Sequence, residues 1–201
     1  MQSLHHNIIF FCLFASATAW GHTPKEGDVW TNVGPFLHRT KTPHGIANEA
    51  AKVGGGIVVE GDVDYNGGVE IAMIYVDKLY VRKRDEDVVA ERIKRMYITT
   101  GYRHWFVPAF STGLAFFSGY SMGDPKVVLD ERPSGDKLVT SARKITEYGF
   151  DTSVQWQLYG DERFGAVVDF RYSWSLSREE QEDADTYGAM LSFKYLVPKR
   201  G

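Results

Sequence analysis

Residues 146–177 alternate between apolar and polar side chains with a period of two. The apolar positions are Tyr148, Phe150, Thr152, Val154, Trp156 and Leu158 before a turn, and Phe164, Ala166, Val168, Phe170, Tyr172, Trp174 and Leu176 after it. A period of two places successive side chains on opposite faces of a β-strand, whereas a helix would repeat every 3.6 residues. The pattern therefore predicts a hairpin of two strands, each with one apolar face and one polar face.

A three-residue loop, Gly160-Asp161-Glu162, keeps apolar residues opposite apolar residues along this hairpin. On the polar face the resulting register places Asp151 directly opposite Arg171. On the apolar face it places Tyr148 opposite Trp174, far from the turn. These assignments fix which side chains should meet across the two strands.

Each strand of the hairpin runs for about a dozen residues, longer than the usual 5 to 6 and close to the 9 to 11 that a tilted strand needs to cross a bilayer. The apolar face is aromatic at both ends, with Trp156 and Phe164 near the turn and Tyr148 and Trp174 at the other end. Aromatic girdles of this kind mark the two interfaces of a membrane-spanning barrel. The alternative is a secreted β-sandwich, in which the apolar faces would form a core.

Six further segments bring the number of predicted strands to eight. They are residues 28–37, 55–65, 69–82, 92–105, 110–122 and 186–197. The pair Gly34-Pro35 is expected to interrupt the first, because proline lacks a ladder donor. Between the second and third, Asn66-Gly67-Gly68 is predicted as a three-residue loop that pairs Tyr65 with Val69 and holds a glycine in the left-handed conformation.

The connections between these strands alternate between long and short. The long ones are residues 38–53, 83–91, 123–144 and 178–185. Outer-membrane barrels have short periplasmic turns and long outer loops, and an even strand number leaves both termini in the periplasm. The predicted fold is all-β: an eight-stranded antiparallel transmembrane β-barrel with up-and-down meander topology.

The N-terminal residues read as a targeting segment. An apolar run of 13 residues, 8–20, contains Ala17-Thr18-Ala19, which has the form of a signal-peptidase site. We therefore predict a signal peptide over residues 1–19 and a barrel domain over residues 20–201. The one cysteine, Cys12, would be removed, which leaves no disulfide or thiol nucleophile. The formal net charge of -3 argues against a general affinity for nucleic acid.

The last predicted strand resembles the C-terminal signal that the bacterial barrel-assembly machinery reads. The matching residues are Thr186, Gly188, Leu191 and Phe193 within Thr186-Tyr187-Gly188-Ala189-Met190-Leu191-Ser192-Phe193. The terminal aromatic residue of that signal is missing here, since the chain continues to Gly201.

Residues 28–197 as a whole look like the small eight-stranded outer-membrane proteins, a class that includes OmpA-type transmembrane domains. The resemblance implies a place in the bacterial outer membrane, contact with its lipids and lipopolysaccharide, and insertion by the assembly machinery. That fold hosts anchors, adhesins, narrow channels and some lipid A-modifying enzymes, so the fold alone does not decide the function.

The inward face of the predicted barrel carries charged residues that must find partners in a narrow lumen. They are Glu60, Asp62, Glu147, Asp151, Asp169, Arg171 and Lys194. We expect a structural core of ion pairs. The competing interpretation is a gated path for protons or ions through the same network.

Candidate chemistry outside the lumen is sparse. The histidines after the signal peptide are His22 in the lead-in, His38 and His44 in or beside the first long loop, and His104 beside a short turn. None has a serine in the same stretch on the outer side, so no catalytic residue is predicted. The acidic run of Glu179, Glu180, Glu182, Asp183 and Asp185 is expected to be a solvated loop tip rather than a metal site.

The sequence therefore predicts an outer-membrane barrel with a structural or surface-interaction role, no cofactor and no enzymatic activity. A narrow channel is the alternative, and a lipid A-modifying enzyme is a third interpretation. The long charged loops offer a surface to an extracellular partner.

Overall fold

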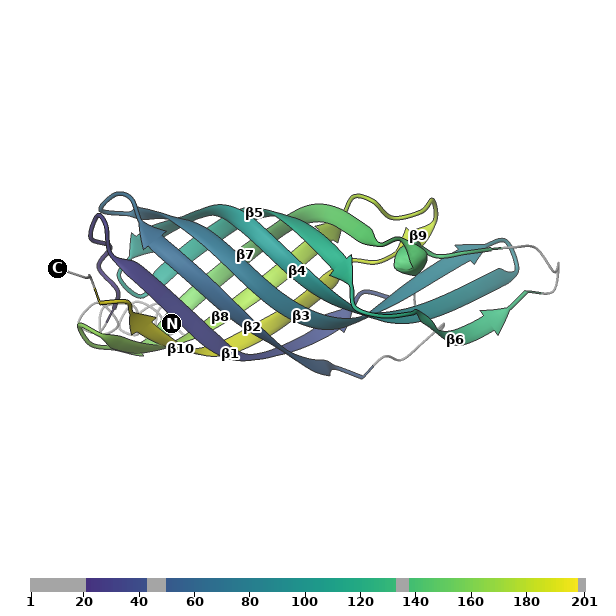
Figure 1. The fold of residues 1–201 in the computed structure, drawn as a ribbon, viewed down its shortest axis with the longest axis horizontal. Helices are drawn as coiled ribbons and strands as arrows, with labels where there is room; N and C mark the ends of the chain where they lie inside the picture. Colours follow the sequence, from purple (N-terminus) through teal and green to yellow (C-terminus); the bar gives the residue numbers. More distant parts are fainter. Residues whose placement is uncertain (1–20, 43–49, 133–137, 199–201) are drawn as a thin grey trace, which may run out of the picture.

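A computed structural model describes residues 21–42, 50–132 and 138–198, and eight long strands within them form a closed barrel. The eight are β1 (Val29–Thr40), β2 (Lys52–Asp62), β3 (Gly67–Arg84), β4 (Asp87–Val107), β5 (Phe110–Ser121), β7 (Thr146–Gly160), β8 (Phe164–Ser175) and β10 (Thr186–Leu196). Each pairs antiparallel with the next, and β10 pairs with β1 to close the ring (Figure 1). The predicted fold class is confirmed.

The two ends of the barrel differ. The turn end holds the short connections β2–β3, β4–β5 and β7–β8 and the first and last described residues. The loop end holds the longer connections, which carry the 3-10 helix η1 (Ser141–Arg143) and the short strands β6 (Lys126–Glu131) and β9 (Glu182–Asp183). The predicted signal peptide and Cys12 lie outside the described residues. None of the described residues forms a helix long and apolar enough to cross a membrane.

Strand β1 runs without a break through Gly34-Pro35, so the predicted interruption is wrong. Pro35 lies opposite Gly55 of β2. A Cβ added to Gly34 would lie 2.0 Å from the carbonyl oxygen of Leu191 on β10. Glycine therefore lets the two backbones approach closely at the seam that closes the barrel.

Strands β3 and β4 continue past the barrel, and the predicted charged loop 83–91 is wrong. Arg84 pairs with Asp87 across a two-residue turn, in which Asp85 takes the left-handed φ of 54°. β4 is 21 residues long, about twice what a membrane crossing needs. β6 pairs with its outer part, and residues 79–92 and 126–131 are here called the loop-end extension (Figure 1). The short strand β9 pairs with the other side of this extension, at Val81 and Arg82 of β3.

The register of the β7–β8 hairpin differs from the predicted one by two positions. Asp151 lies opposite Ser173, and Trp174 lies opposite Phe150 rather than Tyr148. The strands pair up to Gly160 and Gly165 beyond a bulge, so the turn is longer than the three residues expected. As far as the bulge, a shift by two positions leaves each side chain on its predicted face, because the side-chain period of a strand is also two. Beyond the bulge the shift is three positions, since Tyr159 pairs with Ala166, and Tyr159 is exposed.

The β2–β3 hairpin shows the same kind of difference. Gly61 pairs with Val69, so Tyr65 lies in the turn instead of opposite Val69. Neither Gly67 nor Gly68 has a positive φ, and the predicted left-handed glycine is wrong. The observed partner of Val69 is four positions away from the predicted one, an even number, so the side chains of both strands stay on their predicted faces.

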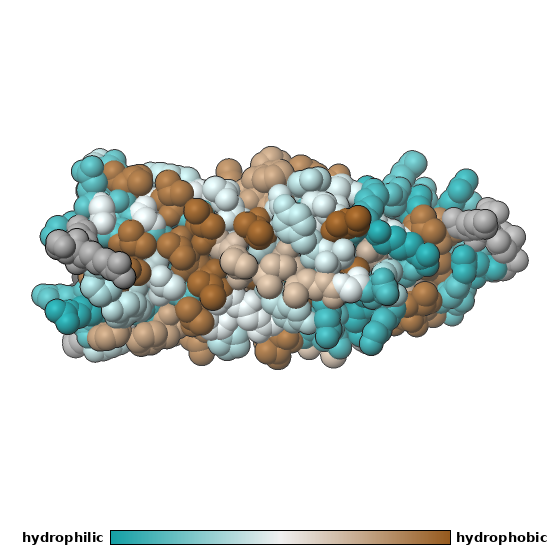
Figure 2. Space-filling model, in the orientation of Figure 1, coloured by the Kyte–Doolittle hydropathy of each residue, from teal (hydrophilic) through white to brown (hydrophobic). Residues whose placement is uncertain are grey.

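The outer face of the barrel carries a belt of exposed apolar and aromatic side chains. It includes Val33, Leu37, Ile57, Ile71, Met73, Ile98, Leu114, Phe116, Phe150, Val154, Phe170, Leu191 and Phe193. Figure 2 shows apolar residues gathered over the barrel wall, with hydrophilic residues dominating the two ends. The inner face is buried and carries most of the charged residues of the strands, apart from one apolar layer, and this is the arrangement of a barrel that spans a membrane.

Candidate functional site

The lumen near the turn end contains a network of buried ion pairs, here called the turn-end cluster. Its members are Glu60, Glu70, Arg103, Asp151, Asp169, Arg171 and Lys194, none more than 3% exposed. Glu70 lies at its centre, with Oε2 accepting from Arg103 at 2.5 Å and Oε1 accepting from Arg171 at 2.5 Å. Charges buried in this way persist only when they are paired and hydrogen-bonded.

Two cations extend this network in different directions. Arg171 also donates through Nε to Asp169 at 2.8 Å and through Nη1 to Asp151 at 2.9 Å. Lys194 donates to Glu60 at 2.7 Å and lies 4.7 Å from the centre of the Trp105 ring. The sequence-predicted inward charges are therefore buried, and the ion-pair core is confirmed.

A layer of apolar side chains follows the turn-end cluster along the lumen. It consists of Phe36, Val58, Ala72, Ile74, Val76, Tyr97, Phe117 and Met190. On β3 the inward residues run from Glu70 through Ala72, Ile74 and Val76 to Lys78, so this layer separates two charged regions. The side chains fill the space, as expected for an eight-stranded barrel. A continuous row of polar groups does not connect the two regions along this strand.

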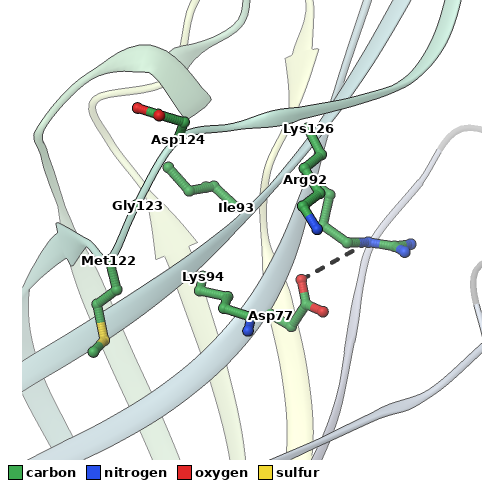
Figure 3. A pocket seen from close by; sticks show the side chains of 8 residues that line it. All are labelled: Asp77, Arg92, Ile93, Lys94, Met122, Gly123, Asp124 and Lys126. Atoms are coloured by element: carbon green, nitrogen blue, oxygen red, sulfur yellow. Dashed lines mark ion pairs between the residues drawn. The ribbon is translucent and has the colours of Figure 1, made fainter.

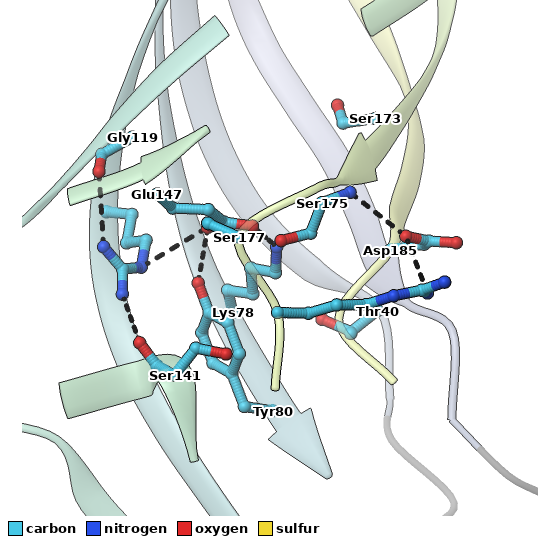
Figure 4. Close-up of polar contacts among 12 residues, drawn as sticks. Thr40, Lys78, Tyr80, Gly119, Ser141, Glu147, Ser173, Ser175, Ser177 and Asp185 are labelled. Atoms are coloured by element: carbon cyan, nitrogen blue, oxygen red, sulfur yellow. Dashed lines mark hydrogen bonds and ion pairs between the residues drawn. The ribbon is translucent and has the colours of Figure 1, made fainter. Parts of the chain in front are cut away.

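Beyond the apolar layer lies a second buried network, the loop-end cluster, built on Lys78, Arg95 and Glu147. Figure 4 shows Lys78, Tyr80 and Glu147 of this network. Glu147 accepts from Lys78 Nζ at 2.5 Å and from the hydroxyl of Tyr80 at 2.5 Å. The hydroxyl of Tyr97 also reaches it, at 3.2 Å. The carboxylate thus accepts from one charged and two neutral donors, and Arg95 Nε lies 3.5 Å from its Oε2 as a second cation.

The loop end of the lumen is covered by residues 138–145 and 178–185. Arg95 donates to the carbonyl oxygens of Ser141 and Lys144, each at 3.0 Å. Glu182 accepts from the backbone nitrogen of Ser141 at 2.8 Å and from its hydroxyl. These contacts hold both segments across the barrel mouth. The prediction that the acidic run is a solvated loop tip is wrong at Glu182 and at Asp185, both of which are buried.

Glu91 of β4 ties this cover to the loop-end extension. Its carboxylate accepts from Thr140 Oγ1 at 2.6 Å and from Arg143 Nη2 at 2.6 Å. Burial of Glu91 raises its pKa, but the hydrogen bonds from Arg143 and Thr140 outweigh this effect and hold the pKa below its ordinary value. The cover therefore depends on a charged carboxylate.

The turn end is closed by His22, which the sequence predicts to lie in a lead-in. Its ring lies 4.5 Å from the ring of Trp105, and its Nε2 lies 3.2 Å from Asp62 Oδ1. The backbone nitrogens of His22 and Lys25 donate to Gln157 and Asp62. The lead-in is therefore folded into the barrel mouth.

The remaining histidines do not assemble a catalytic pair in the described part of the chain. His38 is buried on β1, where its Nε2 accepts from the backbone nitrogen of Asp77 at 3.2 Å. His104 lies on β4 near the turn end, and His44 lies outside the described residues. Within the described ranges, no group of three or more His, Cys, Asp or Glu residues has the geometry of a metal site.

Sequence reasoning missed several lumen residues, chiefly Glu70, Lys78, Arg95 and Arg103. The sequence of β4 holds a usable signal, because Met96, Ile98, Thr100 and Tyr102 share one face of the strand and would point outward. Alternation then requires Arg95 and Arg103 to point inward.

The loop-end extension offers a surface of a different kind. β6 is the last strand on its side of the sheet, so among the described residues no strand pairs with its outer edge. Val127 and Val128 on this strand are 54% and 48% exposed. An uncovered edge with exposed apolar side chains is a template for pairing with another chain.

Comparison with known proteins supports the fold and nothing narrower. No known family matches the chain, and no curated protein matches it. Among solved structures, the chain is similar to the outer membrane protein OprG from Pseudomonas aeruginosa, with a TM-score of 0.56, 11% identity, and coverage of 89% of this chain and 99% of that one.

A second similar structure is Ail, the attachment invasion locus protein of Yersinia pestis, in complex with the heparin analogue sucrose octasulfate. It gives a TM-score of 0.52 and 12% identity, and the match covers 85% of this chain and 100% of Ail. The chain thus has the fold of bacterial outer-membrane barrels.

Proposed function

We propose that the protein is an outer-membrane barrel that acts through its loop-end extension, by binding an extended segment of a partner protein along the outer edge of β6. The observation that carries this proposal is the contrast between a filled lumen and a sheet that continues beyond the membrane belt. β4 is about ten residues longer than a strand needs to be to cross a membrane. At the usual rise per residue, these residues form about 30 Å of projecting strand.

The orientation that this function needs follows the general rule for such barrels. Short turns lie in the periplasm and long connections lie outside the cell. The turn end, with the first and last described residues, then faces the periplasm, and the extension faces the exterior. OprG and Ail share the fold, and Ail is an attachment invasion locus protein.

The edge of β6 suits a peptide partner better than a polyanionic one. It carries Lys126 at one end and Asp130 and Glu131 at the other, with two exposed valines between them. Backbone hydrogen bonds along a free strand edge supply affinity, and alternate side chains supply specificity. Because one end of β6 is positive and the other is negative, its edge would favour a peptide segment whose charges are arranged in the opposite order.

The test compares cells that display the wild-type protein with cells that display a shortened variant. In that variant Asn-Gly replaces residues 82–89 and joins Val81 to Ala90, which are direct partners in the β3–β4 ladder. Retention on surfaces coated with extracellular-matrix proteins, with heparin or with other bacterial cells is measured. We expect the shortened variant to lose the retention that the wild type shows.

The matched control replaces only Asp85-Glu86 with Asn-Gly and leaves both strands at full length. It should be retained like the wild type. Equal retention of the shortened variant and the wild type on every surface would contradict the proposed function.

The narrow channel is the second candidate, and planar-bilayer conductance separates it from the first. The apolar layer should prevent steady single-channel steps in the wild type. A variant with Phe36→Ala and Met190→Ala, which hollows that layer, serves as the positive control for a leak. Steady steps from the wild type would favour the channel.

A further inference from the structure

We propose that the outer wall at the base of the loop-end extension binds the phosphorylated headgroup of a membrane lipid. A cavity of about 400 Å³ opens there, beside the point where β3, β4 and β6 leave the barrel. Its lining consists of Asp77 of β3, Arg92, Ile93 and Lys94 of β4, Lys126 of β6, and Met122, Gly123 and Asp124 of the β5–β6 connection (Figure 3). The site goes beyond the proposed function, since it uses the barrel wall and not the edge of β6.

The cavity gathers cations in an arrangement that an anion would stabilise. Arg92 and Lys126 are direct partners on neighbouring strands, and like charges in such positions repel each other. Asp77 offsets part of this charge, at 3.8 Å from Arg92. Within the described residues, Lys94 and Lys126 have no carboxylate at ion-pair distance. A phosphate group bound between them would relieve the repulsion.

Backbone features shape this cavity. The β4–β6 ladder shifts register between Ala90 and Glu91, and a bulge of this kind re-aims the side chains that follow it. Gly123 takes a φ of +119°, which directs the chain away from β5 and forms one wall. The backbone nitrogen of Met122 donates to the carbonyl oxygen of Lys94 at 2.8 Å and fixes the connection to β4.

The position of the cavity identifies a lipid as the source of the phosphate. The apolar belt begins directly next to it, where Met96 pairs with Tyr120. Met122, in the cavity lining, is 50% exposed, and Tyr120 is 44% exposed. A lipid could place its anionic group on the cations and its acyl chains along these side chains, whereas free phosphate would use only the first part of the site.

Native mass spectrometry of the purified protein in a neutral detergent tests the proposal. The protein is titrated with phosphorylated lipid A, with dephosphorylated lipid A and with inorganic phosphate. We expect the wild type to bind phosphorylated lipid A in preference to both other probes. The double variant Lys94→Gln, Lys126→Gln should bind it about tenfold more weakly, because two charge-assisted contacts are lost.

The matched control is the double variant Lys25→Gln, Lys83→Gln, which removes two exposed lysines at the turn end and at the tip of the extension. Its affinity should equal that of the wild type. Heat-dependent mobility on a detergent gel confirms that each variant is folded. Asp77→Asn should strengthen binding, because it removes a negative charge from the cavity.

Three results would overturn the proposal. Unchanged affinity of the Lys94→Gln, Lys126→Gln variant would show that these lysines do not hold the headgroup. Equal binding of dephosphorylated lipid A would show that the lipid is held by apolar contacts with the belt and not by its phosphate group. Equally tight binding of inorganic phosphate would identify a soluble anion as the ligand. The adhesion experiment on the shortened extension is independent of all three.

Discussion

Arg171 and Asp151 form an ion pair of 2.9 Å between Nη1 and Oδ1, although they are not cross-strand partners. Arg171 lies opposite Ser153, and Asp151 lies opposite Ser173, whose hydroxyl donates to it at 2.7 Å. The pair is therefore diagonal. Arginine is long enough to span a diagonal between neighbouring strands, where the shorter serine side chains leave room.

This geometry predicts unequal costs for removing the two partners. Arg171 pairs with Asp169 and Glu70 as well as Asp151, so Arg171→Ala leaves Asp151 without a cation and leaves the other two carboxylates to share Arg103. This change should cost about 3 to 5 kcal/mol of unfolding free energy. Asp151→Ala leaves Arg171 with two carboxylate partners and should cost clearly less. Urea unfolding from lipid vesicles measures both.

Arg163→Ala, in the exposed β7–β8 turn, is the control and should be nearly neutral. The double variant Asp151→Ala, Arg171→Ala should cost less than the sum of the single changes, because the two residues interact. Equal losses from both single variants, adding fully in the double variant, would show that the diagonal pair does not form.

Phe116 and Phe117 are neighbours in the sequence but lie on opposite faces of β5. Substituting each of them distinguishes packing in the lumen from contact with lipid. Phe117 is fully buried and stacks on Tyr97 at 4.6 Å, whereas Phe116 is 46% exposed on the belt. Both Phe→Ala changes lose transfer free energy, but only the change at Phe117 leaves a cavity, which adds about 2 kcal/mol. Unfolding from vesicles should show the larger loss for Phe117→Ala. A larger loss for Phe116→Ala would mean that the two faces are assigned the wrong way round.

The faces of the strands were predictable, whereas their registers were not. Period-two alternation decides which side chains point inward, and the partner shifts are even in the β2–β3 hairpin and in the β7–β8 hairpin as far as its bulge. The register depends on the turns, where the bulge between Gln157 and Tyr159 has no distinct sequence signal. Sequence could therefore place Asp151 and Arg171 in one lumen without giving their true partners.

Residues 71–76 of β3 are apolar on both faces, so the sequence does not show which of them point inward. The structure explains this pattern: Ile71 and Met73 face the lipid, while Ala72 and Ile74 belong to the apolar layer inside the barrel. A strand with two apolar faces gives no alternation to follow. The charged residues 83–91 predict a loop, but the structure shows paired strands there. Charged side chains occur both in loops and in strands that are exposed to water, so they do not distinguish the two.

The tryptophans should report depth in the membrane. Trp174 lies near the loop end of the belt and Trp156 near its turn end, while Trp30 and Trp105 are buried in the lumen beside Lys194. Single-tryptophan variants in vesicles with depth-dependent lipid quenchers should place Trp174 and Trp156 at shallow depths. Trp30 and Trp105 should respond weakly to every lipid quencher. A deep position for Trp156 or Trp174 would move the boundaries of the belt.

The cover of the loop end should loosen in acid, because it depends on ionised Glu91. The hydrogen bonds from Arg143 and Thr140 lower the pKa of Glu91 from its ordinary value of 4.5. A group with a depressed pKa stabilises the folded state above its unfolded pKa, and this contribution disappears as pH falls through the folded value. Arg143 is largely exposed, so solvent screening limits the contribution to about 1 kcal/mol.

Glu91→Gln removes the charge and keeps the size of the side chain. At pH 7 hydrogen exchange at the backbone amides of Ser141 and Ala142 should be faster in this variant than in the wild type, after correction for intrinsic exchange. The difference should shrink as pH falls below 4.5 and through the lowered pKa of the folded carboxylate, because the wild-type side chain then becomes protonated as well. Glu86→Gln at the exposed tip of the extension is the control and should match the wild type at every pH. A difference between Glu91→Gln and the wild type that persists unchanged at pH values well below 4.5 would show that the ionised carboxylate does not hold the cover.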